Sequence, residues 1–370
     1  MTIRNALTGG NGRKAGSVQA AALPAAQKIE GTNKMSFSVV ICTYNYAHLL
    51  PDALKSVAAQ TLQDFELLIV DDGSTDNTAE IAEQFRPLFQ DFRYVKKPHA
   101  GPADARNVGV QAAKGTHIAF LDGDDLWSPH YLTAMWESLS AHSEAGLALC
   151  EGITVRNENG MITEAALDRG LPTLCGPVNS PRDLFRVIQS VAPSGLVFSR
   201  DLYNRTGPFD VESFGWFSED IDWVFRALIA GTFCLCVKRR LYLYRRHAGN
   251  LTNKANDSFR SWLKIYSQTL REARRDPQLD ALARSVIRAR SLRFLPTCSR
   301  RESQRLIQSG IVALGGDSGL RLHYVGTYLG LVSLLKILKR LRQSLRRSFR
   351  KPLAIDLGES PQAIFDALPK

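Results

Sequence analysis

Apolar residues gather in short runs along the first half of the chain, and these runs have the length of strands. The predicted strands are 37–42, 65–70, 92–96 and 117–121. Helical spacing of apolar residues predicts helices after Pro51, around Ile81 and Phe85, and over 103–113. Because strands and helices alternate at short intervals, the pattern predicts an α/β fold with a mostly parallel sheet and right-handed crossovers.

Polar residues follow three of these strands at the point where each apolar run ends. They are Thr43, Tyr44 and Asn45 after the first strand, Asp71 and Asp72 after the second, and Asp122, Asp124 and Asp125 after the strand at 117–121. The carboxyl ends of parallel strands share one edge of a sheet, and ligands of open α/β sheets bind there. The three clusters are therefore expected to face one crevice.

The carboxylates Asp122, Asp124 and Asp125 are close enough in sequence to repel one another. A hard divalent cation such as Mg²⁺ or Mn²⁺ would offset that repulsion, because it takes oxygen ligands and often binds substrate phosphates as well. The alternative is a solvated acidic turn ahead of a helix that Ser128 and Pro129 begin. These residues alone leave both interpretations open.

The motifs of the common nucleotide-binding loops are absent from the sequence. No Gly-x-Gly-x-x-Gly follows the first strand and no Gly-Lys-Ser/Thr loop occurs, so there is neither a dinucleotide fingerprint nor a Walker loop. A nucleotide can still be held if Asp72 accepts a hydrogen bond from a base N–H group. Thr43 or Tyr44 would then contact the base and the ribose.

A second acidic pair, Glu219 and Asp220, stands ahead of a helix predicted to begin near Ile221. A carboxylate at a helix N-terminus is ordinarily a cap, and the alternative role is that of a general base. Farther along the chain, 233–237 and 241–244 are predicted to form a final pair of strands.

The composition is that of an ordinary soluble globular protein, with 44% hydrophobic and 22% charged residues. The six cysteines show neither a metal-type spacing nor a disulfide framework, which favours a reducing compartment. The formal net charge of +11 is unevenly distributed, because residues 254–351 hold 22 Lys and Arg against 6 Asp and Glu. An anionic partner is therefore expected for the C-terminal third.

The pattern divides the chain into five expected segments. They are a flexible tail over 1–34, an α/β domain over 35–253, a helical extension over 254–320, a basic amphipathic helix over 321–351 and a C-terminal tail over 352–370. The helix at 321–351 has nine basic residues, no acidic one and leucines on its other face, which suits an anionic membrane surface. The alternative is a packing or dimerising helix. Nucleic acid is not favoured as a partner, because no recognition motif accompanies the charge.

Several short motifs together resemble those of family 2 glycosyltransferases, inverting enzymes with the nucleotide-sugar-binding GT-A fold. The matching stretches are 39–45, Gln60-Thr61, 70–76, 101–109, 120–125 and Ser218-Glu219-Asp220. Each stretch alone is weak evidence, but their order and spacing are specific, and they cover most of residues 36–225. The resemblance implies a GT-A domain with a Rossmann-like, mostly parallel central sheet.

The resemblance also assigns expected roles to single residues. It implies that Thr43, Tyr44, Asn45 and Asp72 bind the nucleoside, that Arg106 lies near the diphosphate, and that Asp122 and Asp124 hold the metal and diphosphate, with Asp124 the more direct ligand. The alternative for Arg106 is a surface cation on a helix.

For the acceptor half of the site, the resemblance implies that Asp220 is the catalytic base and that Glu219 supports it. A histidine at the position of His247 approaches the metal or the diphosphate in similar proteins, and the alternative is a histidine on a surface loop. The Gln-x-x-Arg-Trp motif of processive members is absent, which favours transfer of one sugar per encounter.

The sequence thus predicts an inverting glycosyltransferase that depends on Mn²⁺ or Mg²⁺. Its donor would be a nucleotide-diphosphate sugar, most simply a UDP-sugar, and its acceptor a hydroxyl of a glycan or glycolipid in cell-surface polysaccharide or lipid-linked glycan synthesis. The N-terminus shows no apolar signal-peptide core, so a cytoplasmic protein, peripheral on the membrane, is expected. The rival functions are a nucleotidyltransferase and a non-catalytic sugar-binding protein on the same fold.

Overall fold

The structure is a computed structural model that describes residues 36–158, 161–165, 171–214 and 216–251, with isolated positions at 265, 277, 281 and 308. The predictions for the segments 1–34, 321–351 and 352–370 lie outside the described residues, as does nearly all of the expected helical extension at 254–320.

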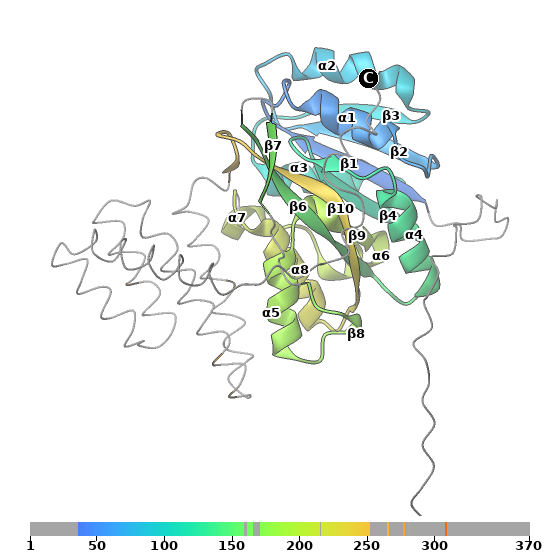
Figure 1. Ribbon diagram of the computed structural model, residues 1–370, viewed down its shortest axis with the longest axis vertical. Helices are drawn as coiled ribbons and strands as arrows, with labels where there is room; N and C mark the ends of the chain where they lie inside the picture. Colours follow the sequence, from blue (N-terminus) through green and yellow to red (C-terminus); the bar gives the residue numbers. More distant parts are fainter. Residues whose placement is uncertain are drawn as a thin grey trace, which may run out of the picture. The chain divides into compact units, whose positions relative to one another are not determined.

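The four strands predicted from the apolar runs lie side by side and are parallel (Figure 1). They are β1 (Phe37–Thr43), β2 (Phe65–Asp71), β3 (Phe92–Lys96) and β4 (His117–Asp122), in the order β3-β2-β1-β4. Phe37 pairs with Phe65 on one side and with His117 on the other, so the three central strands begin level with one another. Their carboxyl ends therefore reach the same edge of the sheet.

The second half of the chain extends this sheet beyond β4 with strands of mixed direction. The order continues with β9 (Leu196–Ser199), β6 (Leu147–Glu158), β10 (Phe233–Arg246) and β5 (Leu126–Trp127), while β7 (Met161–Ala165) pairs with β6 and β8 (Cys175–Pro177) pairs with β10. Strand β9 is antiparallel to both β4 and β6, whereas β10 is parallel to β6. The carboxyl end of β10 consequently points toward the same edge as that of β4.

Helices cover both faces of the sheet, because alternate residues of each strand point to opposite sides. The helices are α1 (Leu50–Ala58), α2 (Thr78–Phe85), α3 (Pro102–Ala112), α4 (Tyr131–Ala141), α5 (Pro181–Ser190), α6 (Arg200–Thr206), α7 (Val211–Phe214) and α8 (Glu219–Ile229), with 3-10 turns at Arg86–Leu88 and Pro193–Gly195. Val39 and Ile41 of β1 pack in the same core as α1 and α4, while Val40 packs in the same core as α3, α5 and α8. The predicted α/β class is confirmed.

The predicted pair of strands at 233–237 and 241–244 is wrong, because both stretches belong to the one strand β10. Its register against β6 shifts between Val237 and Arg240 and again between Arg240 and Tyr242. The stretch between the two apolar runs is Lys-Arg-Arg, which lacks the glycine, proline or asparagine of a tight turn. The chain therefore bulges and continues along β6 instead of turning back.

Helix α3 lies very close to β1, because Gly109 presents no side chain there. A Cβ atom built on Gly109 would come within 2.4 Å of the Val40 Cγ1 atom.

We expect Gly109→Ala to lower the free energy of unfolding by about 1–3 kcal/mol in urea titrations, although alanine favours helices. Gly146→Ala is the control, since its Cβ would meet ordinary contacts of 3.4 Å or more. Equal stability of both variants would contradict this packing.

Candidate active site

The three polar clusters after β1, β2 and β4 do lie together, as the sequence predicts. The Asp72 backbone N–H donates to the Thr43 carbonyl at 3.0 Å, and the Gly123 N–H donates to the Cys42 carbonyl at 3.0 Å. The Asn45 N–H donates to the Ser74 Oγ at 2.8 Å. These bonds join the ends of the three parallel strands into one polar edge.

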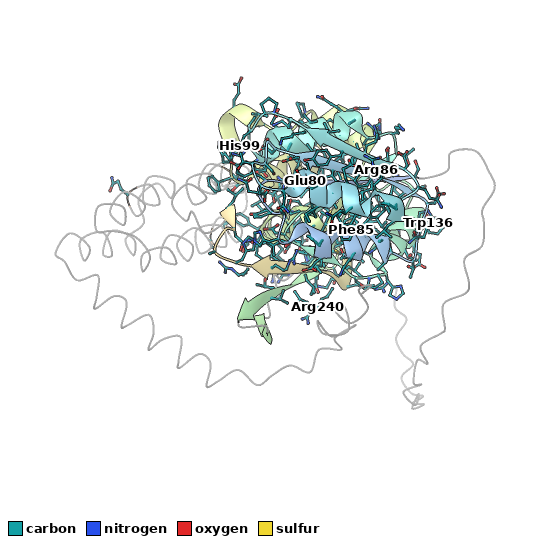
Figure 2. All side chains as sticks on the ribbon, turned by 90° about the horizontal axis from the view of Figure 1, so that it is seen from above. Glu80, Phe85, Arg86, His99, Trp136 and Arg240 are labelled. Atoms are coloured by element: carbon teal, nitrogen blue, oxygen red, sulfur yellow. The ribbon has the colours of Figure 1, made fainter. Side chains whose placement is uncertain are left out.

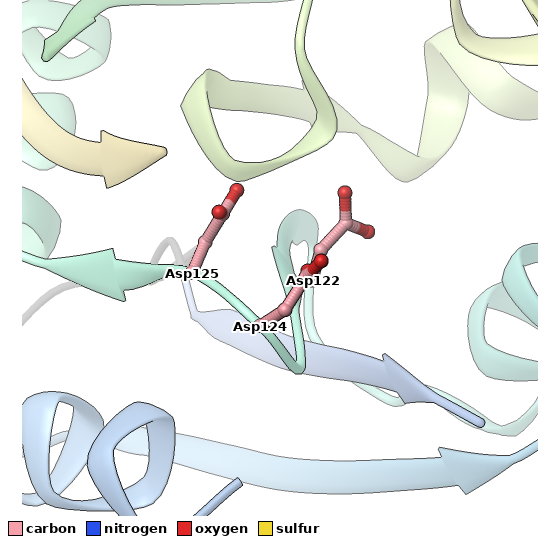
Figure 3. Close-up of side chains that lie close together, drawn as sticks. All are labelled: Asp122, Asp124 and Asp125. Carbon is pink, nitrogen blue, oxygen red and sulfur yellow. The ribbon is translucent and has the colours of Figure 1, made fainter. Parts of the chain in front are cut away.

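Three carboxylates crowd the turn after β4 (Figure 3). Ligand oxygens of Asp122, Asp124 and Asp125 lie within 4.8 Å of one another. Asp125 is the most firmly held, because it accepts hydrogen bonds from the Ser194 Oγ at 2.6 Å and from the Arg245 backbone N–H at 3.0 Å. Asp125 therefore anchors the turn, while Asp122 is more exposed and Asp124 faces a different set of partners.

Asp124 is held by residues that follow β10. Its Oδ2 accepts a hydrogen bond from the Asn250 Nδ2 at 3.0 Å and lies 3.0 Å from the His247 Nε2. Asn250 also accepts the His247 backbone N–H at 2.6 Å, and the Arg245 Nε donates to the Asp124 carbonyl. His247 thus lies beside the carboxylate that the sequence predicts as the more direct metal ligand, and not on a remote surface loop.

The electrostatics of this turn fit a divalent cation. Burial raises the pKa of Asp122 to about 6, although Arg106 opposes the shift, and burial raises the pKa of Asp125 well above its usual value. Both pKa values are raised further by neighbouring carboxylates, so the ionised state of the turn is costly. Carboxylate oxygens are ligands that Mn²⁺ and Mg²⁺ prefer.

A buried arginine joins the acidic turn to the acidic pair before α8. Arg106 is 4% exposed, donates to Asp122 Oδ1 at 2.8 Å and forms a second ion pair with Glu219. The alternative interpretation of Arg106 as a surface cation is therefore wrong. Its Nε is buried and has no hydrogen-bond partner within the described part of the chain.

Glu219 and Asp220 occupy the first turn of α8, and their environments differ. Glu219 is 4% exposed, and burial raises its pKa to about 7 while Arg106 opposes the shift. Asp220 is half-buried and accepts a hydrogen bond from the Ile221 backbone N–H at 2.9 Å. Ser218, the residue before the pair, has a φ of 65°, a strained value that sets the direction in which the helix starts. Asp220 is near enough to Asp122 to raise its pKa.

The residues predicted to bind the nucleoside line the same edge, but they are not equally available. Thr43 is buried, and its Oγ1 has no hydrogen-bond partner in the described residues. Tyr44 is 37% exposed and offers an aromatic ring. The Asn45 Oδ1 is occupied, because it accepts the Thr75 N–H at 2.8 Å. Asp72 is buried and already accepts hydrogen bonds from the loop after β3.

Four residues of the site were missed by the sequence reasoning: Ser194, Asn250, His99 and Trp216. Ser194 and Asn250 hold the acidic turn, His99 stacks on Tyr44, and Trp216 contacts His99. Ser194 and His99 do not stand in a run of like residues. Two signals are present in the sequence: Trp216 lies in the aromatic stretch Phe214-Gly-Trp-Phe217, and the stretch Arg-Arg-His-Ala-Gly before Asn250 brings a histidine and an amide close together.

The fold is of the GT-A type, with an acidic turn at the end of a parallel strand and an acidic helix start near it. Residues 38–168 match the domain model of glycosyl transferase family 2, so this part of the chain is similar to that family. It is 34% identical over 184 residues to an uncharacterized glycosyltransferase of Nostoc sp., covering 48% of this chain and 54% of that one. The chain spans about half, or less, of the length of the first curated relatives that it matches.

Two solved structures show the same fold. TarS from S. aureus, residues 1–349 in complex with UDP, superposes with a TM-score of 0.60 at 20% identity, covering 87% of this chain and 95% of that one. The mannosyltransferase PcManGT from Pyrobaculum calidifontis, in complex with GDP-Man and Mn²⁺, gives a TM-score of 0.52 at 17% identity, covering 83% and 88%.

Removing the Glu219 carboxylate should destabilise the fold, because Arg106 would keep only Asp122 as an ionic partner. Breaking a buried ion pair from one side typically costs about 3–5 kcal/mol, so we expect Glu219→Ala to lower the free energy of unfolding by about that amount. Chemical denaturation measures it. Glu83→Ala is the control, because it removes an exposed pair with Arg86 and should change little. Similar stability of the two variants would count against a structural Arg106–Glu219 pair.

Proposed function

We propose that the protein transfers one sugar from a nucleotide-diphosphate sugar to an acceptor hydroxyl, with inversion at the anomeric carbon and dependence on a divalent cation. The observation that carries this proposal is the pairing of two acidic elements at one sheet edge. The turn of Asp122 and Asp124 provides oxygen ligands, and Asp220 stands at the start of α8 within electrostatic range of Asp122.

Asp220 is assigned as the base of the transfer. As the acceptor oxygen attacks the anomeric carbon, its proton passes to the Asp220 carboxylate and the bond between the sugar and the diphosphate oxygen breaks, leaving its electron pair on the diphosphate. The backbone N–H of Ile221 and the helix N-terminus orient this carboxylate. Glu219 takes a different role, because its ion pair with Arg106 is buried and commits it to holding the guanidinium.

Asp124, Asp122 and His247 are the residues that would hold the cation, as Mn²⁺ or Mg²⁺. When bound, the cation would offset the charge that builds on the leaving diphosphate. Asp125 and Asn250 keep the turn and the imidazole in place. The Mn²⁺ in the PcManGT complex supports this assignment.

We propose a UDP-sugar as the donor, which the UDP complex of TarS supports. The acceptor is proposed to be a hydroxyl of a glycan or glycolipid in the synthesis of cell-surface polysaccharide or lipid-linked glycan. Without a Gln-x-x-Arg-Trp motif in the sequence, one sugar is expected per encounter. Membrane attachment through 321–351 and a cytoplasmic, peripheral location complete the proposal. In the part of the chain that the structure describes, no helix combines the length and apolarity needed to cross a bilayer.

Asp220→Asn and Asp124→Asn should separate catalysis from donor binding. A panel of nucleotide sugars with Mn²⁺, scored by release of free nucleoside diphosphate, first identifies the donor. We then expect Asp220→Asn to lower kcat by about 10²–10⁴-fold with little change in UDP affinity. We expect Asp124→Asn to weaken Mn²⁺-dependent UDP binding in calorimetry. Turnover of Asp220→Asn within a few-fold of the parent would show that another residue is the base.

The basic segment 321–351 gives a test of membrane attachment. Each basic residue near an anionic surface contributes roughly 1 kcal/mol, and salt screens the attraction. We expect the full chain to sediment with vesicles containing phosphatidylserine but not with neutral phosphatidylcholine vesicles. Replacing Arg346, Arg347 and Arg350 together by glutamate should release it, whereas the same change at Arg182, Arg186 and Arg205 in the α/β domain should not. Equal sedimentation of both triple variants would refute attachment through this segment.

A further inference from the structure

Asp72 is saturated with hydrogen-bond donors from the chain itself. Its two carboxylate oxygens accept from the Lys97 Nζ, from the backbone N–H groups of Ala100 at 3.0 Å and Gly101 at 2.8 Å, and from the His99 Nδ1 at 2.8 Å. A carboxylate offers about four acceptor positions. Asp72 therefore has no acceptor position left for a base N–H group, contrary to the role expected from the sequence.

The same contacts fix the tautomer of His99. Its Nδ1 lies 2.8 Å from the Asp72 carbonyl oxygen and 2.8 Å from the Asp72 Oδ2, and both of these atoms are acceptors. The Nδ1 atom must therefore carry the proton. In the neutral imidazole this leaves Nε2 as an acceptor without a proton. Within the described part of the chain, His99 makes no hydrogen bond through Nε2.

His99 lies at the edge of the domain (Figure 2), and its imidazole contacts two aromatic rings. It stacks on Tyr44 with ring centroids 3.7 Å apart and an interplanar angle of 11°, and Trp216 meets it edge-on at 4.8 Å. About a third of the His99 side chain is exposed, at 34%, and Trp216 is 41% exposed. Exposed aromatic rings beside a polar acceptor suit a flat ligand with a hydrogen-bonding edge, which describes a nucleobase.

We propose that His99, oriented by Asp72, reads the nucleobase of the donor and selects uracil by accepting its N3–H group at Nε2. This inference rests on the proposed function, since it assigns the base specificity of the same donor site. Uracil presents an N–H donor at N3, whereas cytosine, a ring of the same size, presents a lone pair there. Two lone pairs facing each other repel, so a histidine held in this tautomer favours UDP over CDP.

The UDP-to-CDP preference of His99→Phe tests the assignment, because phenylalanine keeps the ring between Tyr44 and Trp216 and removes the acceptor. Calorimetry with Mn²⁺ should show that the parent protein binds UDP at least about tenfold more tightly than CDP. In His99→Phe that preference should fall to within about threefold of unity. A preference that survives in His99→Phe, or an equal loss of affinity for both nucleotides, would overturn the assignment.

His142→Phe is the matched control. His142 also stacks on an aromatic ring, that of Phe233 at 6.1 Å, but Phe233 begins β10 at the end of the strand far from the site. The preference of His142→Phe for UDP over CDP should equal that of the parent protein. Inorganic pyrophosphate with Mn²⁺ lacks a base and should bind all three proteins alike. If the parent binds neither nucleotide, the proposed function fails as well; if it binds UDP with a preference independent of His99, this inference alone fails.

Discussion

The buried guanidinium of Arg106 is the group on which the rest of the site depends. It lies between the acidic turn after β4 and the first turn of α8, two elements that are far apart in the sequence, and its ion pairs with Asp122 and Glu219 hold them together. A charge removed from water is tolerated only when it is paired. The helix that positions Asp220 is therefore fixed relative to the acidic turn by one side chain of α3.

Positive charge inside the site falls short of the negative charge there. Asp122, Asp124, Asp125, Glu219 and Asp220 gather around Arg106 and Arg245, and burial and mutual repulsion raise the pKa values of Asp122, Asp125 and Glu219. Hydrogen bonds from Ser194 and from the backbone of Arg245 stabilise one of these carboxylates, Asp125. A cation and its bound diphosphate would complete the balance, which gives the site a preference for the two species together.

The sequence alone predicts those features of the fold that depend on a local pattern of apolar and polar residues. The buried strands β1 to β4 follow from continuous apolar runs, and the polar ends of those strands follow from parallel geometry. The three aspartates are alike in sequence, yet it is the Asp125 carboxylate that is bonded to the Ser194 hydroxyl, 69 positions away, and to the backbone of Arg245, 120 positions away. Such distinctions depend on tertiary contacts, which a one-dimensional pattern does not contain.

The aromatic surroundings of the nucleoside site were missed for the same reason. His99 and Trp216 come from separate loops, and the sequence does not show that they meet. Only the structure shows that His99 contacts both Tyr44 and Trp216.

The error at β10 has a different origin. Two apolar runs separated by basic residues resemble a hairpin, and only pairing with β6 along both runs shows that the strand continues.

The course of β10 also determines when the site can exist during synthesis of the chain. Asp124 meets His247 across 123 positions, and its other partner Asn250 lies beyond that. Closing so long a segment is slow compared with forming local contacts. When the first four strands have left the ribosome, the acidic turn is therefore still without its imidazole, and the two come together only after nearly all of the α/β domain has emerged.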